Sequence, residues 1–195
     1  MGASRTPYVA CYNVGTLIAN FNIMNDQYYQ MTVPVFKRSL TALKGVLKKG
    51  EAFAKEKKVS EDVFLKHRLA FDMFDLTKQV QVASDNAKGS AARLAGVVPP
   101  SMEDSEKSFA ELEARIDKTI AFLETLTPEH FKDAADRKIH LPYFKDKHFL
   151  GHEFASAYAL PNFFFHVVTA YDILRHLGVN VGKADYMGEI PMYND

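Results

Sequence analysis

The sequence predicts an all-α protein, a single domain built as a four-helix bundle with a long irregular crossover before the last helix. Hydrophobic residues make up 47% of the 195 positions, which is enough for a substantial core. Apolar residues recur at spacings of three and four over several long segments, and Gly or Pro separates these segments. We expect an N-terminal extension over residues 1–26, the bundle over 27–188 and a C-terminal tail over 189–195.

The first two long helices are predicted from their amphipathic periodicity. Over about residues 28–57, and again over about 71–94, apolar side chains fall on one face of a helix. Ser60 can cap a short segment between them, and Gly96 can end the second helix as its C-cap. The many alanines of the second helix predict close contact with its neighbours. The positions on its predicted apolar face are Met73, Leu76, Val80, Ala83, Ala87, Ala91 and Leu94.

The third and fourth helices are separated by the longest predicted connection. Pro99 interrupts the helical pattern, and Ser101 or Ser105 is expected to start a third helix of about 20 residues. Helical periodicity is lost over residues 127–151, where we expect a small hairpin or an irregular lid. The fourth helix contains residues 161–176 and is apolar nearly all round, which predicts the most buried element.

Charge and cysteine content exclude several classes of partner. Lys plus Arg and Asp plus Glu both number 24, which argues against nucleic acid or an anionic membrane as a partner. No apolar stretch approaches the roughly 18 residues needed to span a bilayer, and a single cysteine, Cys11, excludes an internal disulfide. We therefore expect a soluble, cytoplasmic protein. Residues 1–6 also match the N-myristoylation pattern at Gly2, with Cys11 nearby as a second acylatable residue.

The candidate site lies between the second and fourth helices, because bundle proteins place ligand sites in the core between facing helices. Asn162 and His166 are four residues apart and therefore project from one face, with Tyr158 a turn earlier. Gln79, beside the apolar stripe of the second helix, is expected to be buried opposite His166. Such a set can bind a metal or a small molecule, or His166 can be a core histidine whose nitrogens are satisfied by hydrogen bonds.

Further polar residues surround this set in the sequence. Asp72 follows the same predicted helical line as Gln79, and Arg68 can neutralise Asp72 or hold a loop in place. Asp85 and Lys88 are three residues apart, which predicts a surface ion pair.

A second candidate metal site lies at the end of the predicted lid. His148 and His152 have the four-residue spacing of histidines that bind a metal from one helix face, and Glu153 adjoins them. The His-Glu-x-x-His pattern of zinc peptidases is incomplete, and no third ligand is evident. Ordinary polar residues at a helix start are the alternative interpretation.

Two long stretches carry a family resemblance. Residues 68–81, RLAFDMFDLTKQVQ, and residues 160–175, which begin LPNFFFH and end AYDILR, together resemble the domain-of-unknown-function family nineteen ninety-three, a branch of the DinB/YfiT-like superfamily. The resemblance covers about residues 28–188. It implies an up-down-down-up four-helix bundle that often forms a homodimer.

The resemblance also implies a metal site. In the wider superfamily nickel or zinc is held by one histidine on the second helix and a His-x-x-x-His pair on the last. Here His166 matches the second histidine of the pair, Asn162 stands at the first, and the second-helix position falls near residues 79–82, where there is no histidine. Gln79, Asn162 and His166 would then be the ligands. Two of these are weak amide donors, so a metal-free pocket is an equal alternative.

Two functions are consistent with these residues. The first is an enzyme for a small organic molecule, with His166 as acid/base or metal ligand. The resemblance favours it, because described superfamily members are mostly enzymes, including thiol transferases and hydrolases. The second is a noncatalytic ligand-binding or accessory protein with a degenerate metal site. The enzyme hypothesis assigns catalysis to His166, Asp72 and Tyr171, and substrate binding to Gln79, Asn162, Tyr158 and Arg68.

Overall fold

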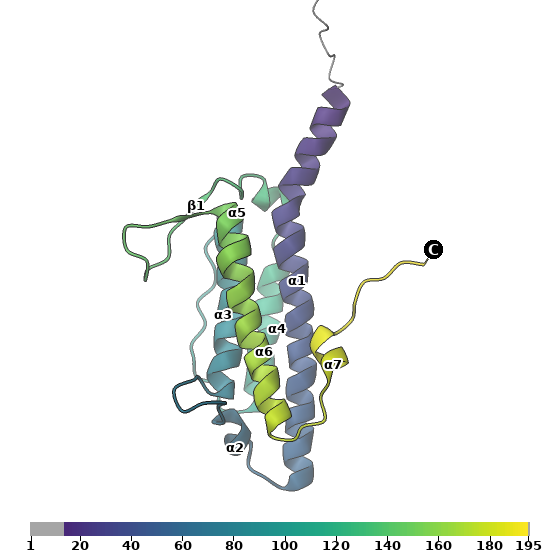
Figure 1. Cartoon of the computed structure of the whole chain (residues 1–195), viewed down its shortest axis with the longest axis vertical. Helices are drawn as coiled ribbons and strands as arrows, with labels where there is room; N and C mark the ends of the chain where they lie inside the picture. Colours follow the sequence, from purple (N-terminus) through teal and green to yellow (C-terminus); the bar gives the residue numbers. More distant parts are fainter. Residues whose placement is uncertain (1–13, 195) are drawn as a thin grey trace, which may run out of the picture.

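The computed structural model describes the backbone of residues 14–194, with side chains from Gln27 onward. The predicted acylation positions, Gly2 and Cys11, lie outside the described residues. The first helix, α1 (Val14–Lys57), begins about 14 residues earlier than its periodicity predicts. Its first turns extend beyond the other helices, so half of the predicted N-terminal extension is helical (Figure 1).

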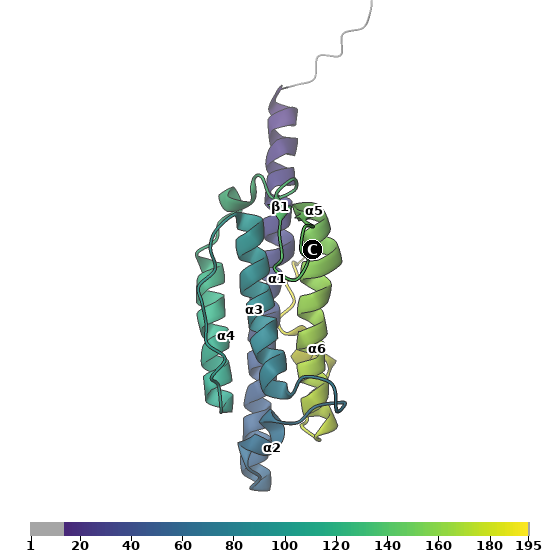
Figure 2. The same cartoon turned by 90° about the vertical axis from the view of Figure 1, so that its left-hand side faces the viewer.

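Four long helices form the predicted bundle. They are α1, α3 (Leu76–Ala95), α4 (Phe109–Glu124) and α6 (Leu160–His176). The helices α1 and α6 run in one direction and α3 and α4 in the other, as Figures 1 and 2 show. The α3 helix packs against both α4 and α6, and α1 contacts all three. The all-α bundle and its up-down-down-up order are therefore confirmed.

Short elements connect the long helices. Between α1 and α3 lies α2 (Glu61–Leu65), and η1 (Pro128–Phe131) follows α4. The strands β1 (Lys138–Ile139) and β2 (Phe149–Leu150) pair antiparallel, so the predicted lid contains a small hairpin. The segments α5 (Gly151–Glu153) and η2 (Phe154–Ala159), the latter a π-helix, lead directly into α6. The last helix is α7 (Lys183–Met187).

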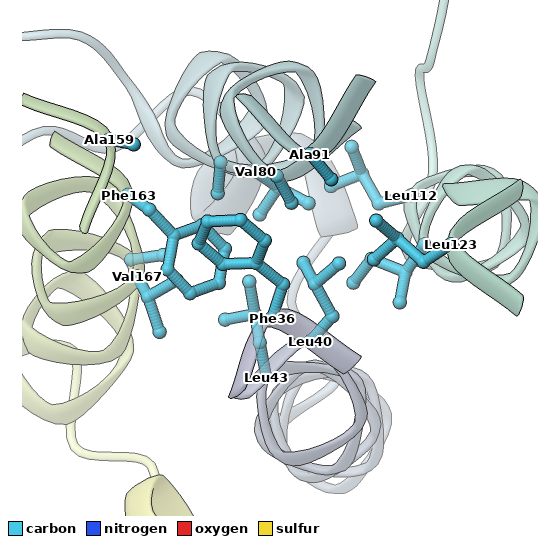
Figure 3. Close-up of a cluster of buried hydrophobic side chains, with 14 of the residues drawn as sticks. Phe36, Leu40, Leu43, Val80, Ala91, Leu112, Leu123, Ala159, Phe163 and Val167 are labelled. Carbon is cyan, nitrogen blue, oxygen red and sulfur yellow. The ribbon is translucent and has the colours of Figure 1, made fainter. Parts of the chain in front are cut away.

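The core is built where apolar faces of the four helices meet. Phe36 of α1 meets Phe163 of α6 edge to face, with 4.7 Å between ring centroids. Ala83, Ala87 and Ala91 of α3 are fully buried, and their small side chains allow the neighbouring helices to approach closely. Figure 3 shows the side chains that fill the centre of the bundle. Those labelled there are Phe36, Leu40, Leu43, Val80, Ala91, Leu112, Leu123, Ala159, Phe163 and Val167.

Two helix starts differ from the prediction. The α3 helix begins at Leu76 rather than near residue 71, because the Asp75 side chain caps it by accepting a hydrogen bond from the Lys78 backbone N–H. The α4 helix is capped by Ser108, whose side chain accepts from Glu111, and not by Ser101 or Ser105. Residues 66–75 and 96–108 are consequently connecting segments.

The crossover over residues 96–108 is held by a buried arginine. Arg115 of α4 is almost fully buried, and its guanidinium reaches three carboxylates. The distances are 2.9 Å to Asp85, 3.0 Å to Asp104 and 2.9 Å to Glu106. Because Asp104 and Glu106 belong to the crossover and Asp85 to α3, this ion-pair network joins three segments of the chain.

The predicted surface ion pair of Asp85 and Lys88 is part of the same network. Lys88 is buried, lies 3.1 Å from Asp85 and donates a hydrogen bond to the Pro100 carbonyl. The prediction of a solvent-exposed pair was wrong, because the crossover covers this side of α3.

The α6 helix is buried on one side only. Phe163, Val167 and Ala170 lie in the core, whereas Phe165 is 55% exposed and Val168 is 37% exposed. The prediction that this helix is the most buried element therefore fails on its outer face. No helix in the described part of the chain is both long and apolar enough to cross a membrane.

Candidate functional site

A polar seam runs along the contact between α3 and α6. Gln79 of α3 faces His166 of α6, and Asn86 of α3 faces Asn162 of α6. Gln79 and Asn86 are seven residues apart on α3, and Asn162 and His166 are four residues apart on α6, so each pair lies on one face of its helix. Because the two helices are antiparallel, Gln79 meets His166 and Asn86 meets Asn162. The seam thus places the predicted residues Gln79, Asn162 and His166 on one contact surface.

His166 and Gln79 form a buried pair. His166 is 7% exposed and Gln79 is 1% exposed, and 2.7 Å separates His166 Nδ1 from Gln79 Oε1. The Gln79 amide nitrogen donates to the Phe74 carbonyl at 3.3 Å, which assigns the amide oxygen to the imidazole side. His166 Nδ1 must then carry the hydrogen of this bond. The burial of Gln79 opposite His166 is confirmed.

The His166 imidazole is held in its neutral form. Burial lowers the pKa of His166 below 6.5, so the ring is uncharged near pH 7. With the hydrogen on Nδ1, the Nε2 atom carries a lone pair. This atom makes no hydrogen bond within residues 27–194. Such an atom can accept a proton or bind a ligand.

Aromatic side chains border the imidazole. Phe74, on the loop before α3, lies nearly parallel to the His166 ring with 6.4 Å between centroids. Phe165 meets the same ring edge to face at 5.2 Å. Phe74 is half exposed, so the imidazole is bordered on this side by a loop side chain that itself reaches solvent.

Asn162 is held by a residue that the sequence analysis missed. Its amide nitrogen donates to Asn86 Oδ1 at 2.7 Å. The signal for Asn86 was its position seven residues after Gln79, which places both side chains on the same face of α3.

The donor set does not fit a zinc or nickel site. Gln79 and Asn162 supply neutral amides, which are weak ligands for these metals. The Gln79 amide oxygen, the only atom through which this side chain could bind a metal, already accepts the hydrogen of His166 Nδ1. No three His, Cys, Asp or Glu side chains gather around a possible metal position in the part of the chain that the structure describes.

Three predicted site residues make no hydrogen bond or ion pair with His166. Asp72 is exposed on the loop over residues 66–75, where it has no hydrogen-bond or ion-pair partner among the described residues. Arg68 contacts the Met73 carbonyl at 3.2 Å and Asp75 at 3.7 Å, so it holds this loop rather than neutralising Asp72. Tyr171 faces the C-terminal segment, where its hydroxyl lies 3.5 Å from the Val181 carbonyl.

Tyr158 belongs to the hairpin end of the seam. It lies on η2, one turn before Asn162, and its hydroxyl is hydrogen-bonded to the hydroxyl of Tyr143 on the hairpin loop. Burial raises the pKa of Tyr158 above its usual range. Tyr158 therefore lies on the predicted face of the last helix, with a partner from the lid.

The two lid histidines do not form the predicted pair. His148 precedes strand β2, whereas His152 lies in α5, so the four-residue spacing does not fall on one helix. The His148 ring lies 5.5 Å from the His140 ring, and His152 Nδ1 lies 3.1 Å from the Ala135 carbonyl. The premise of a metal site from His148 and His152 was therefore wrong.

Comparisons with known proteins identify the family. Residues 28–187 match the family model described as Domain of unknown function (DUF1993). A crystal structure of a DinB family member protein from Shewanella denitrificans is 43% identical, with a TM-score of 0.86. The match covers 89% of this chain and 99% of that one. No curated protein matches the chain. The chain therefore belongs to the DUF1993 family and has a DinB-like fold.

Proposed function

We propose that the chain is an enzyme for a small organic molecule and that neutral His166 is its acid/base group. The observation that carries this proposal is the pair of Gln79 and His166. Gln79 fixes the hydrogen on Nδ1, and Nε2 is left as a proton acceptor within an aromatic surrounding. A general base must be unprotonated at the working pH, and burial keeps the His166 imidazole neutral by lowering its pKa.

In the proposed site the ligand binds beside Nε2 of the His166 imidazole. Phe74 is the side chain that an entering ligand displaces, because it is half exposed and belongs to a loop. Asn162 lies four residues before His166 on α6 and supplies, after Gln79, the next amide of the seam for positioning a polar group. The reaction class that fits is proton transfer to or from a weakly polar substrate, without a metal.

Modification with diethyl pyrocarbonate tests whether Nε2 is available, since this reagent acylates unprotonated imidazole. We expect mass spectrometry to find His166 modified in the native chain, and modified faster in Phe74→Ala. Native protein in which His166 stays unmodified, and reacts only after unfolding, would support a core histidine instead.

A panel of small esters and thiol acceptors tests turnover. We expect His166→Gln to abolish turnover of a substrate found in the panel while its circular dichroism and melting temperature stay close to those of the native chain. Binding of a panel compound without turnover would favour the second candidate, a noncatalytic ligand-binding protein that uses the same seam.

We also propose that the chain forms a homodimer through the outer face of α6. Phe165 and Val168 are exposed three residues apart on this face. Contiguous exposed apolar side chains are typical of interfaces. A two-fold symmetric dimer would bury this face against its own copy.

A further inference from the structure

Arg93 occupies the third position of the polar seam. It follows Asn86 by seven residues on α3, as Asn86 follows Gln79, and Tyr158 lies opposite it, four residues before Asn162. The first two positions of the seam are paired by hydrogen bonds. The partly buried Arg93 guanidinium, in contrast, has no hydrogen bond or ion pair among residues 27–194.

A glycine makes room for the Arg93 side chain. A Cβ atom at Gly89 would lie only 2.6 Å from Arg93 Nη1. The guanidinium therefore folds back over the preceding turn of α3 and occupies the space that any other residue at position 89 would fill. This geometry keeps the positive charge close to the surface of α3.

Two tyrosine hydroxyls lie near this charge. Tyr143 and Tyr158 share one hydrogen bond between their hydroxyls, so one of their two O–H groups remains to donate elsewhere. Burial raises the pKa of Tyr158, while the charge of Arg93 acts in the opposite direction, which places Arg93 within electrostatic reach of this hydroxyl. Apolar rings surround the tyrosines, and Phe149 and Phe154 are packed at 5.7 Å and 5.6 Å from Tyr158.

We propose that Arg93, Tyr158 and Tyr143 form a binding site for a carboxylate carried on a small apolar or aromatic molecule. Arginine binds carboxylates through two parallel N–H donors, and the free hydroxyl hydrogen supplies a third donor. The aromatic rings provide a surface for the apolar body. A basic residue in the last turn of α3 also complements the helix dipole, but that role requires neither the glycine nor the tyrosine pair.

The site is separate from His166. Arg93 lies fourteen residues beyond Gln79 on α3, which is roughly 21 Å along the helix axis. The proposal therefore goes beyond the proposed acid/base function, and the two can fail independently.

Isothermal titration of the full chain with benzoate tests the proposal. Benzamide serves as the uncharged isostere, and inorganic phosphate as the oxyanion without an apolar body. We expect benzoate to bind and benzamide not to bind. Arg93→Met should weaken benzoate binding at least about ten-fold. Arg38→Met on α1, another partly buried arginine with no partner among the described residues, should leave it unchanged, as should His166→Gln.

Gly89→Ala provides a second variant that does not remove the charge. The new methyl group displaces the flexible guanidinium, while alanine in a helix interior maintains or raises stability. We expect weaker benzoate binding together with an unchanged or higher melting temperature.

Two results would overturn the proposal. They are equal benzoate binding by Arg93→Met and the native chain, and no binding of benzoate by the native chain, whether or not phosphate binds.

Discussion

At the scale of single residues, His166 depends on an uncharged partner. A carboxylate facing Nδ1 would favour the imidazolium, but Gln79 offers an amide oxygen 2.7 Å away and leaves burial as the dominant effect on the His166 pKa. The same amide fixes the tautomer, because its nitrogen donates to the Phe74 carbonyl. One glutamine therefore sets both the charge and the free nitrogen of the imidazole.

Replacing Gln79 with glutamate should reverse the direction of the His166 pKa shift. The new carboxylate would lie at hydrogen-bond distance from the ring, and such a charge typically raises a neighbouring pKa by about 1 to 3 units. NMR titration of the His166 ring in Gln79→Glu measures the change. Gln79→Met, which has a similar volume and no charge, is the control. An unchanged His166 pKa in Gln79→Glu would show that the pair does not control protonation.

Protonation of His166 should also link stability to pH. Because burial lowers the folded-state pKa below 6.5, the unfolded chain binds a proton more readily at mildly acidic pH. Stability is therefore complete above the unfolded-state pKa and decreases as pH falls through the folded-state pKa. We expect urea midpoints to drop less in His166→Gln than in the native chain between about pH 7.5 and 5.5. Parallel decreases in both proteins would contradict the assignment.

At the scale of elements, the periodicity of the sequence predicts which segments are helical better than it predicts where each helix begins and ends. The α3 face was predicted from apolar spacing, and the site face of α6 from the four-residue spacing of Asn162 and His166. Gln79 was placed opposite His166 because it borders the apolar stripe of α3. The start of α3 was misplaced because Phe71 and Met73 continue the helical spacing, whereas the Asp75 cap breaks the helix after them. The start of α3 is therefore set by the Asp75 cap and not by the apolar periodicity.

The network around Arg115 could not be predicted from spacing. Asp104 and Glu106 follow two prolines, in a segment with no helical period, and only the folded crossover brings them to Arg115. Burial acts to raise the pKa of Glu106, but hydrogen bonds from Arg115 and Gln81 hold it below its usual range. These interactions stabilise the crossover along α3 and α4.

Removing Arg115 should destabilise the crossover and the whole domain. Arg115→Met leaves Glu106 nearly buried without its cation, and loss of one partner of a buried ion pair costs about 3 kcal/mol. Urea unfolding measures this loss, and hydrogen exchange should show faster exchange over residues 96–108. Lys44→Met, which removes the exposed ion pair of Lys44 with Asp117, should cost less than about 1 kcal/mol. Equal losses in the two variants would contradict a structural role for the network.

At the scale of the whole molecule, the two sides of α6 have different chemistry. The inner side forms the core and the polar seam, and the outer side carries exposed Phe165 and Val168. A helix with apolar residues all round is expected to be buried on all sides. Among the described residues the outer side of α6 remains uncovered. In the homodimer that we propose, a second copy completes its burial.

The homodimer should dissociate when charge is placed on this face. Phe165→Glu puts a carboxylate at the centre of the proposed interface, and in a two-fold dimer the two glutamates would lie close to each other. Sedimentation equilibrium should then show a dimer for the native chain and a monomer for Phe165→Glu. Val98→Glu, at an equally apolar but almost fully exposed position on the crossover, should remain dimeric. A monomeric native chain at all concentrations would exclude the interface. A dimer that survives Phe165→Glu would place the contact on another face. Dimer formation would then not affect the reaction of His166 with diethyl pyrocarbonate.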